Sequence, residues 1–213
     1  MAERGTLWDR SPQRRFCVSS PVDDIVVACI SPYLRTRPLG FSHFRHGSAV
    51  MAAPPPPAIL ELDPSHNRAG RVIEDIVRLE RRIFPKHESL ARSLHDELKR
   101  RNSGLIYASS VADGEEVVGY AMYTCNTSLC ATITKLAVKE SCRRQGHGEA
   151  LLRAAVERCR GRRVQRVILH VDPARTAAVA LYGKAGFRID TTVEGYYAPQ
   201  RDAYRMFIDL EEQ

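Results

Sequence analysis

A glycine-containing loop in the second half of the chain constrains its fold more than any other feature. The loop, Arg143–Gly148, lies between a β-branched segment at 131–138, which predicts a strand, and an apolar stripe from Leu151 to Cys159 at helical spacing. A helix N-terminus carries unpaired backbone N–H groups and about half a positive charge. Glycines let an anion approach that backbone closely. The sequence therefore predicts an α/β fold whose strand-to-helix turn can hold an anion.

The loop does not match the better-known phosphate-binding motifs. It lacks the Gly-Lys-Ser/Thr ending of a Walker loop and the third glycine of a dinucleotide fingerprint. Two glycines alone are a weak signal, and on that basis an ordinary solvated turn with incidental arginines is the better reading.

The composition changes near residue 67. Residues 1–67 are rich in Pro, Ser and Arg, and they include a run from Pro54 to Pro57 that suits neither a packed helix nor a central strand. We expect 1–67 to be a disordered or linker extension and 68–213 to form one domain. Met51 is a plausible second translation start, and residues 1–50 weakly resemble a transit segment, although their acidic residues argue against it.

The periodic region predicts a mixed α/β order. Helical stripes occur at 72–83 and 90–98, and strands are expected at 105–112, 117–124 and 131–138, with a hairpin turn at Asp113-Gly114. After the glycine loop and its helix come a strand at 167–171, a helix at 177–184, and closing strands at 187–193 and 203–210. These elements predict helices packed on both faces of one mixed sheet.

Four segments of this region resemble the GNAT superfamily of N-acetyltransferases, and most of all its RimI-type and eukaryotic protein N-terminal acetyltransferases. The four segments are Ile83–Pro85, Ile133–Gly148, Leu169–Val171 with Ala180–Phe187, and Tyr196-Tyr197 with Asp202–Tyr204. The resemblance implies an α/β fold with a largely antiparallel central sheet, a splayed central strand and flanking helices.

The resemblance also implies acetyl-CoA as co-substrate. The backbone of Leu136, Ala137 and Val138 would bind its pantetheine arm, because a splayed strand leaves hydrogen-bonding groups for it. The pyrophosphate would be held by the amides of Arg143, Arg144, Gln145, Gly146, His147 and Gly148.

Two side chains are candidates for acid–base chemistry. His170 lies in the otherwise apolar strand VILHV, where the family places a general base; a hydrogen-bonded core histidine is the alternative. Tyr182 would protonate the departing thiolate, or it belongs to the core face of its helix. The oxyanion would be met by a backbone N–H near Val138.

Two positions depart from the family pattern. Some N-terminal acetyltransferases carry a catalytic tyrosine where this chain has Thr132, so that role is absent or moved. Arg175 stands where the family often has an asparagine that contacts the coenzyme; an arginine can still reach a phosphate.

Aromatic residues predict the acceptor side. Phe84-Pro85 and Tyr196-Tyr197 resemble two loops that flank the peptide N-terminus in the protein N-terminal acetyltransferases, although both pairs also suit a core cluster. We expect the N-terminal α-amine of proteins as acceptor, and lysine stays open as a further acceptor. A small-molecule amine is the enzymatic alternative, and for polyamines the sequence shows no acidic cluster near these loops.

A function of another class is a basic ribosome- or RNA-binding module. The net charge is +7, and five arginines gather at the end of the helix after the glycine loop: Arg158, Arg160, Arg162, Arg163 and Arg166. No aromatic RNA motif accompanies them, so such binding would be nonspecific.

The cysteines and the hydropathy bear on metal binding, membrane insertion and cellular location. The six cysteines are scattered without metal-ligand spacing, which predicts no metal site and ordinary free thiols. No run is long and apolar enough to span a membrane. We expect a cytoplasmic location, and nuclear and plastid locations stay open.

Overall fold

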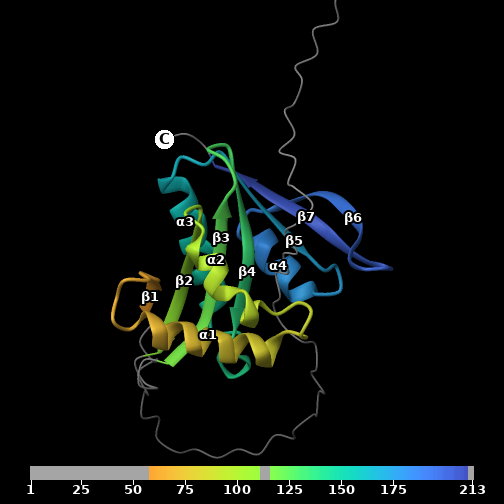
Figure 1. Cartoon of the computed structure of the whole chain (residues 1–213). Helices are drawn as coiled ribbons and strands as arrows, with labels where there is room; N and C mark the ends of the chain where they lie inside the picture. Colours follow the sequence, from red (N-terminus) through yellow and green to blue (C-terminus); the bar gives the residue numbers. More distant parts are fainter. Residues whose placement is uncertain (1–57, 111–115, 211–213) are drawn as a thin grey trace, which may run out of the picture.

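One seven-stranded sheet organises the chain. The computed structural model describes residues 58–110 and 116–210 (Figure 1). In spatial order the strands are β1 (Ala58–Glu61), β2 (Ser103–Ser110), β3 (Glu116–Cys125), β4 (Cys130–Val138), β5 (Arg166–Val171), β7 (Arg201–Asp209) and β6 (Arg188–Ala198). All neighbours are antiparallel except β4 and β5, which are parallel. The predicted mixed, largely antiparallel sheet is confirmed.

Helices cover both faces of this sheet. Helix α1 (Ala69–Ile83) and helix α2 (Leu94–Lys99) enclose one apolar core, which includes Ile76 and Leu94. Helix α3 (His147–Gly161) and helix α4 (Thr176–Lys184) enclose the other core on the opposite face. Strand β4 is buried along its whole length because both of its faces pack against a core. Strand β4 therefore forms the centre of the packed sheet.

The parallel strands β4 and β5 separate along their length. Residues Cys130–Thr132 pair with Arg166–Ile168, and no further pairing joins the two strands (Figure 1). A bulge adds to the irregularity, because Met122 of β3 faces Lys135 while Tyr123 faces Ile133, leaving Thr134 unmatched. The predicted splayed central strand is confirmed.

The sheet begins earlier than the sequence indicated. Strand β1 pairs with β2 from Ala58 to Glu61, and Leu62 is buried in the α1 core. The expected linker therefore cannot extend to residue 67, and residues 58–67 belong to the domain. The sequence did not indicate this edge strand, because it follows directly after the run Pro54–Pro57 and its four residues are too few to show a period. Residues 1–57, with the second start at Met51, lie outside the described part of the chain, as does the turn at Asp113-Gly114.

The second helical stripe is interrupted. A 3-10 turn, Leu90–Arg92, precedes α2, and Ser93 separates the two. The Leu90 N–H donates to the buried Glu80 carboxylate at 2.6 Å, and the Ser89 hydroxyl accepts from the Ala91 N–H. These side chains cap the first N–H groups of the turn, and Ser93 divides the segment 90–99 into two short pieces.

Candidate active site

The glycine loop opens onto a groove at the start of α3. Gly146 is the N-cap residue of α3 with φ of 83°, and a Cβ placed on it would meet nothing within 4 Å. The groove has a volume of about 450 Å³ and is lined by the loop, by Val138 and by one side of α4. Because helix N-termini present unpaired N–H groups, this groove suits an elongated ligand with a phosphate group at the α3 end.

The predicted loop residues differ in what their side chains do. Arg143 and Arg144 both line the groove, and the Arg143 Nε donates to the Val138 carbonyl at 3.2 Å. Gln145 is turned away and donates to the Ser141 carbonyl at 3.2 Å. The His147 Nδ1 is buried with no hydrogen-bond partner within the described residues, and burial lowers the pKa of His147. His147 is not among the residues that line the groove.

The edge of β4 that faces β5 is open where the resemblance expects pantetheine. Leu136, Ala137 and Val138 pair with β3 on one side, while β5 pairs only as far as Thr132 on the other. Gly119 of β3 allows β3 to lie close to β4, because a Cβ at this position would lie 2.7 Å from the Ala137 carbonyl oxygen. The groove residues and this free edge adjoin at Val138, so one extended ligand can contact both.

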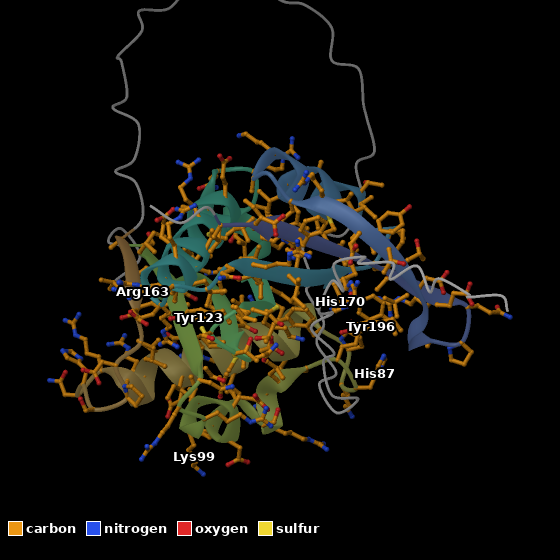
Figure 2. All side chains as sticks on the ribbon, turned by 90° about the horizontal axis from the view of Figure 1, so that it is seen from above. His87, Lys99, Tyr123, Arg163, His170 and Tyr196 are labelled. Carbon is orange, nitrogen blue, oxygen red and sulfur yellow. The ribbon has the colours of Figure 1, made fainter. Side chains whose placement is uncertain are left out.

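His170 projects from β5 toward the α1 side of the sheet, opposite to Leu169 and Val171 in the α3 core. Its ring stacks on Tyr196 at 4.6 Å between centroids, with 9° between the planes; Figure 2 shows the two side by side. Burial, with a smaller effect of Arg205, lowers the pKa of His170 to about 4. The imidazole is therefore neutral at pH 7 and can accept a proton.

The alternative reading of His170 as a satisfied core histidine is not supported. Its Nδ1 is buried, and no hydrogen-bond partner for it occurs in the described ranges 58–110 and 116–210. A buried polar atom without a partner is costly, and such atoms concentrate where a ligand or water binds.

Tyr182 lies on the sheet side of α4. The side chain is fully buried in the α3 core, with the Phe187 ring at 6.1 Å in an edge arrangement. Ala177, Ala180 and Leu181 of the same helix line the groove. Tyr182 therefore occupies the core position that the alternative expected, on a helix that also forms a wall of the groove. Its role as the acid that protonates the thiolate stays a prediction.

The predicted acceptor residues come together from distant segments. Phe84 ends α1 and is buried, with the Lys135 Nζ 4.0 Å from its ring centroid, whereas Pro85 is exposed. Tyr196 and Tyr197 of β6 pack edge to face at 4.9 Å. The Tyr197 hydroxyl is buried and has no hydrogen-bond partner in the described structure.

Thr132 is the last residue of β4 that pairs with β5, and its hydroxyl accepts from Asn126 at 2.9 Å.

A buried ionic cluster joins the acceptor segments, and sequence reasoning missed it. Glu88, in the loop after α1, accepts from Arg201 at 2.5 Å and from Arg175 at 3.4 Å. Arg201 also donates to Asp172 at 2.7 Å. The Lys135 Nζ donates to the Glu88 carbonyl at 2.5 Å, and burial lowers the pKa of Lys135 to about 8. These residues lie far apart in the sequence, and no local pattern relates them.

The cluster bears on one predicted coenzyme residue. Arg175 is the N-cap residue of α4, and its guanidinium contacts Glu88. It is not among the residues that line the groove. The structure therefore brings Arg175 together with the acceptor segments, and its predicted contact with the coenzyme stays a prediction.

Other predicted features can be placed within the described residues. No group of three or more His, Cys, Asp or Glu residues there could hold a metal ion. None of the helices described has the length and apolar character needed to cross a membrane. Three arginines of the predicted basic cluster, Arg158, Arg160 and Arg166, form ion pairs with Glu61, Glu157 and Asp209.

Comparison with protein families and curated proteins agrees with this geometry. A family model described as "Acetyltransferase (GNAT) family" matches residues 73–187. An N-alpha-acetyltransferase of Sulfurisphaera tokodaii is 30% identical over 150 residues, 65% of this chain and 87% of that protein. A Bacillus subtilis protein, provisionally named a ribosomal protein bS18-alanine N-acetyltransferase, is 35% identical over 83 residues, 38% of this chain and 55% of that protein. A mycothiol acetyltransferase of Corynebacterium glutamicum is 32% identical over 77 residues, 36% of this chain and 26% of that protein. The chain thus matches about half of the Bacillus protein and about a quarter of the Corynebacterium protein.

Solved structures show the same fold. Ard1 from Thermoplasma volcanium has a TM-score of 0.59 at 26% identity and covers 73% of this chain and 99% of that chain. An aminoglycoside 6'-N-acetyltransferase complexed with coenzyme A has a TM-score of 0.63 at 15% identity and covers 73% and 98%. The fold is therefore shared, and the acceptor has to be argued from the site.

Proposed function

The chain belongs to the acetyltransferase (GNAT) family, and we propose from this premise that it transfers an acetyl group from acetyl-CoA to the N-terminal α-amine of proteins. The observation that carries the proposal is the arrangement around the opening between β4 and β5. A glycine loop and a groove lie on one side of it, and the unpaired polar atoms of His170 and Tyr197 lie on the other. This is the arrangement that a reaction between a long phosphorylated donor and a separate amine requires.

The donor residues fit acetyl-CoA. The open loop at Gly146 and the lining residues Arg143 and Arg144 suit its pyrophosphate. The free edge of Leu136–Val138 suits the amide groups of pantetheine. Acetyl-CoA then supplies an acetyl thioester at the opening between β4 and β5.

The proton transfers follow from the same geometry. The acceptor amine enters as an ammonium group and must lose a proton before it attacks the thioester carbonyl. The neutral His170 is the group that accepts this proton, directly or through water. A backbone N–H near Val138 stabilises the oxyanion, and the Tyr182 hydroxyl protonates the departing sulfur.

The acceptor side supports a peptide rather than a cationic small molecule. Tyr196 and Tyr197 form an aromatic wall beside His170, and the Tyr197 hydroxyl can hydrogen-bond a peptide backbone. The buried carboxylates Glu88 and Asp172 already pair with Arg175 and Arg201, so they offer little to a polyamine. The named activity of the Sulfurisphaera relative, which this chain covers over 87% of its length, supports the same acceptor.

We also propose a cytoplasmic site of action with transient ribosome association. The relative from Bacillus subtilis carries a ribosomal protein in its name. The ion pairs of Arg158, Arg160 and Arg166 reduce the positive field of the α3 end, so this association should be weak and salt-sensitive.

The experiment that tests the function compares acceptors at equal concentration. Acetyl-CoA turnover is measured with a library of free N-terminal peptides, the same peptides with blocked N-termini and an internal lysine, and polyamines and aminoglycosides. The proposal expects turnover with free N-termini and little with polyamines and aminoglycosides. Turnover confined to the small amines would refute the protein acceptor and keep the family assignment.

A further inference from the structure

A pair of cysteines lies at the end of the sheet opposite to the coenzyme residues. Cys125 ends β3 and is half-buried, and Cys159 is fully buried on α3. Cys125 pairs with Ala131 at the start of β4, whereas Gly119, at the other end of β3, pairs with Val138 of the groove. Tyr123, two residues before Cys125, lies well apart from His170 and Tyr196 in Figure 2. The reaction proposed above makes no use of either thiol.

The surroundings of Cys125 favour its thiolate form. The Arg162 Nη1 lies 3.7 Å from the Cys125 sulfur, and the Cys159 thiol is a second polar neighbour of that sulfur. Both interactions stabilise negative charge, and they hold the pKa of Cys125 well below its usual value although burial opposes them. The neighbouring Cys125 and burial raise the pKa of Cys159 instead. The guanidinium beside Cys125 therefore favours this sulfur as the nucleophile, with Cys159 as its neutral partner.

Arg162 is itself held in place. Its guanidinium carbon lies 5.3 Å from the centroid of the Tyr123 ring, and the Tyr123 hydroxyl donates to Glu61 of β1 at 3.1 Å. Arg162 is the residue that follows α3, and its N–H donates to the Arg158 carbonyl. Glu61 and the thiol of Cys130 complete the titratable groups around the pair. These contacts hold the Arg162 guanidinium next to the Cys125 sulfur.

We propose that Cys125 is an oxidant-sensitive modification site that reacts with hydrogen peroxide and is resolved by Cys159 as a disulfide. The Cys125 thiolate attacks one peroxide oxygen, the O–O bond breaks, and hydroxide leaves, which gives a sulfenic acid. The Cys159 sulfur then attacks the Cys125 sulfur, the S–O bond breaks, and water leaves with the Cys159 proton. The two thiols lose two electrons in total, and the hydroxide takes up a proton, so peroxide ends as two waters. The product joins the last residue of β3 to α3.

The first test measures thiol reactivity in the full chain. Iodoacetamide labelling at pH 6.5, resolved by peptide mass spectrometry, should modify Cys125 about tenfold faster than Cys142, because the thiolate is the reactive form. Cys142 is the internal control, since its sulfur lies beside the neutral Ser141 hydroxyl. Arg162→Gln should slow the labelling of Cys125 several-fold. Arg160→Gln, which removes a neighbouring guanidinium paired with Glu157, should not.

The second test follows oxidation. Treatment with hydrogen peroxide should give a 125–159 linked peptide that dithiothreitol reverses. In Cys159→Ala the sulfenic acid should persist at Cys125 and be trapped by dimedone. Equal labelling of Cys125 and Cys142, or a peroxide-treated chain with no linkage between 125 and 159, would overturn the proposal. Neither readout depends on acetyl transfer.

Discussion

Arg201 Nη1 lies 2.5 Å from Glu88 Oε1, although 113 positions separate the two residues in the chain. Glu88 belongs to the loop after α1, and Arg201 begins β7, directly after the turn that follows Tyr196 and Tyr197. Because Lys135 of β4 also holds the Glu88 carbonyl, this one residue connects the two predicted acceptor segments to the splayed strand. We regard Glu88 as a positioning residue for the acceptor.

Glu88→Gln should raise KM for the peptide more than it lowers kcat. The substitution keeps the side-chain shape and the carbonyl contact with Lys135, but it removes the charge that holds Arg201 and Arg175. We expect a loss of about 1–3 kcal/mol in the free energy of unfolding, as for a buried partner left unsatisfied. Arg201 keeps Asp172 and is 34% exposed, which limits the loss.

Steady-state kinetics with peptide and acetyl-CoA varied separately test this prediction. The matched control is Glu157→Gln, which removes an exposed carboxylate from a surface pair and should change stability by less than about 0.5 kcal/mol. An unchanged KM for the peptide in Glu88→Gln would mean that the cluster serves stability alone.

Gly146→Glu should abolish the binding of acetyl-CoA. It places a side chain and a negative charge where the pyrophosphate is expected, in a backbone conformation that only glycine adopts readily. Saturating acetyl-CoA at about 100 Kd should stabilise the parent by about 2.7 kcal/mol, measured as a rise in Tm. Gly146→Ala, which adds the backbone strain without the charge, should keep part of that rise. A parent-like shift in Gly146→Glu would show that the loop does not hold the coenzyme.

Local sequence patterns predicted most helices and strands. They could not predict side-chain contacts between residues that lie far apart in the chain. The periodicity of 131–138 and 151–159 placed β4 and α3, and the glycine at 146 marked the turn between them. The stripe at 90–98 indicated one continuous helix, whereas Ser93 divides it into the 3-10 turn Leu90–Arg92 and helix α2. Glu88 could not have been chosen from the sequence, since its partners lie 87 and 113 positions away. The roles of His170 and Tyr182 came from the resemblance, because a lone histidine in a strand and a tyrosine on a helix face are equally typical of a core.

Strand β1 makes a specific prediction about truncation. A chain that begins at Met51 keeps β1, whereas one that begins at Pro64 loses Ile59, Leu62 and the Glu61 contacts to Tyr123 and Arg158. Removing two partly or fully buried apolar side chains should cost roughly 2–4 kcal/mol. Urea unfolding of both chains measures the difference. Equal midpoints would show that β1 contributes nothing to stability.

His170→Ala should lower kcat by ~10²–10⁴, the usual range for removal of a general base. The affinity for acetyl-CoA should hardly change, because the groove is lined by the loop, Val138, α3 and α4 and does not include His170. His170→Glu should retain part of the activity, since a partly desolvated carboxylate also accepts protons. If kcat stays unchanged in the alanine variant while Tyr182→Phe is inactive, the proton leaves by another route.

The buried imidazole of His170 also predicts a pH-dependent stability that needs no substrate. Its pKa is lowered from 6.5 to about 4 in the folded chain, chiefly by burial. The unfolded chain therefore binds the proton more tightly, so stability is fully present above pH 6.5 and falls as the pH drops toward 4. A shift of this size corresponds to about 3 kcal/mol, which should be lost progressively between these two pH values. Urea unfolding of the parent and His170→Gln at several pH values measures the slope, with the exposed His95→Gln as control. The slope between pH 6.5 and 4 should become shallower in His170→Gln and stay unchanged in the control. Equal slopes in all three chains would mean that solvent reaches the ring in the folded state, and then burial could not be what keeps His170 neutral.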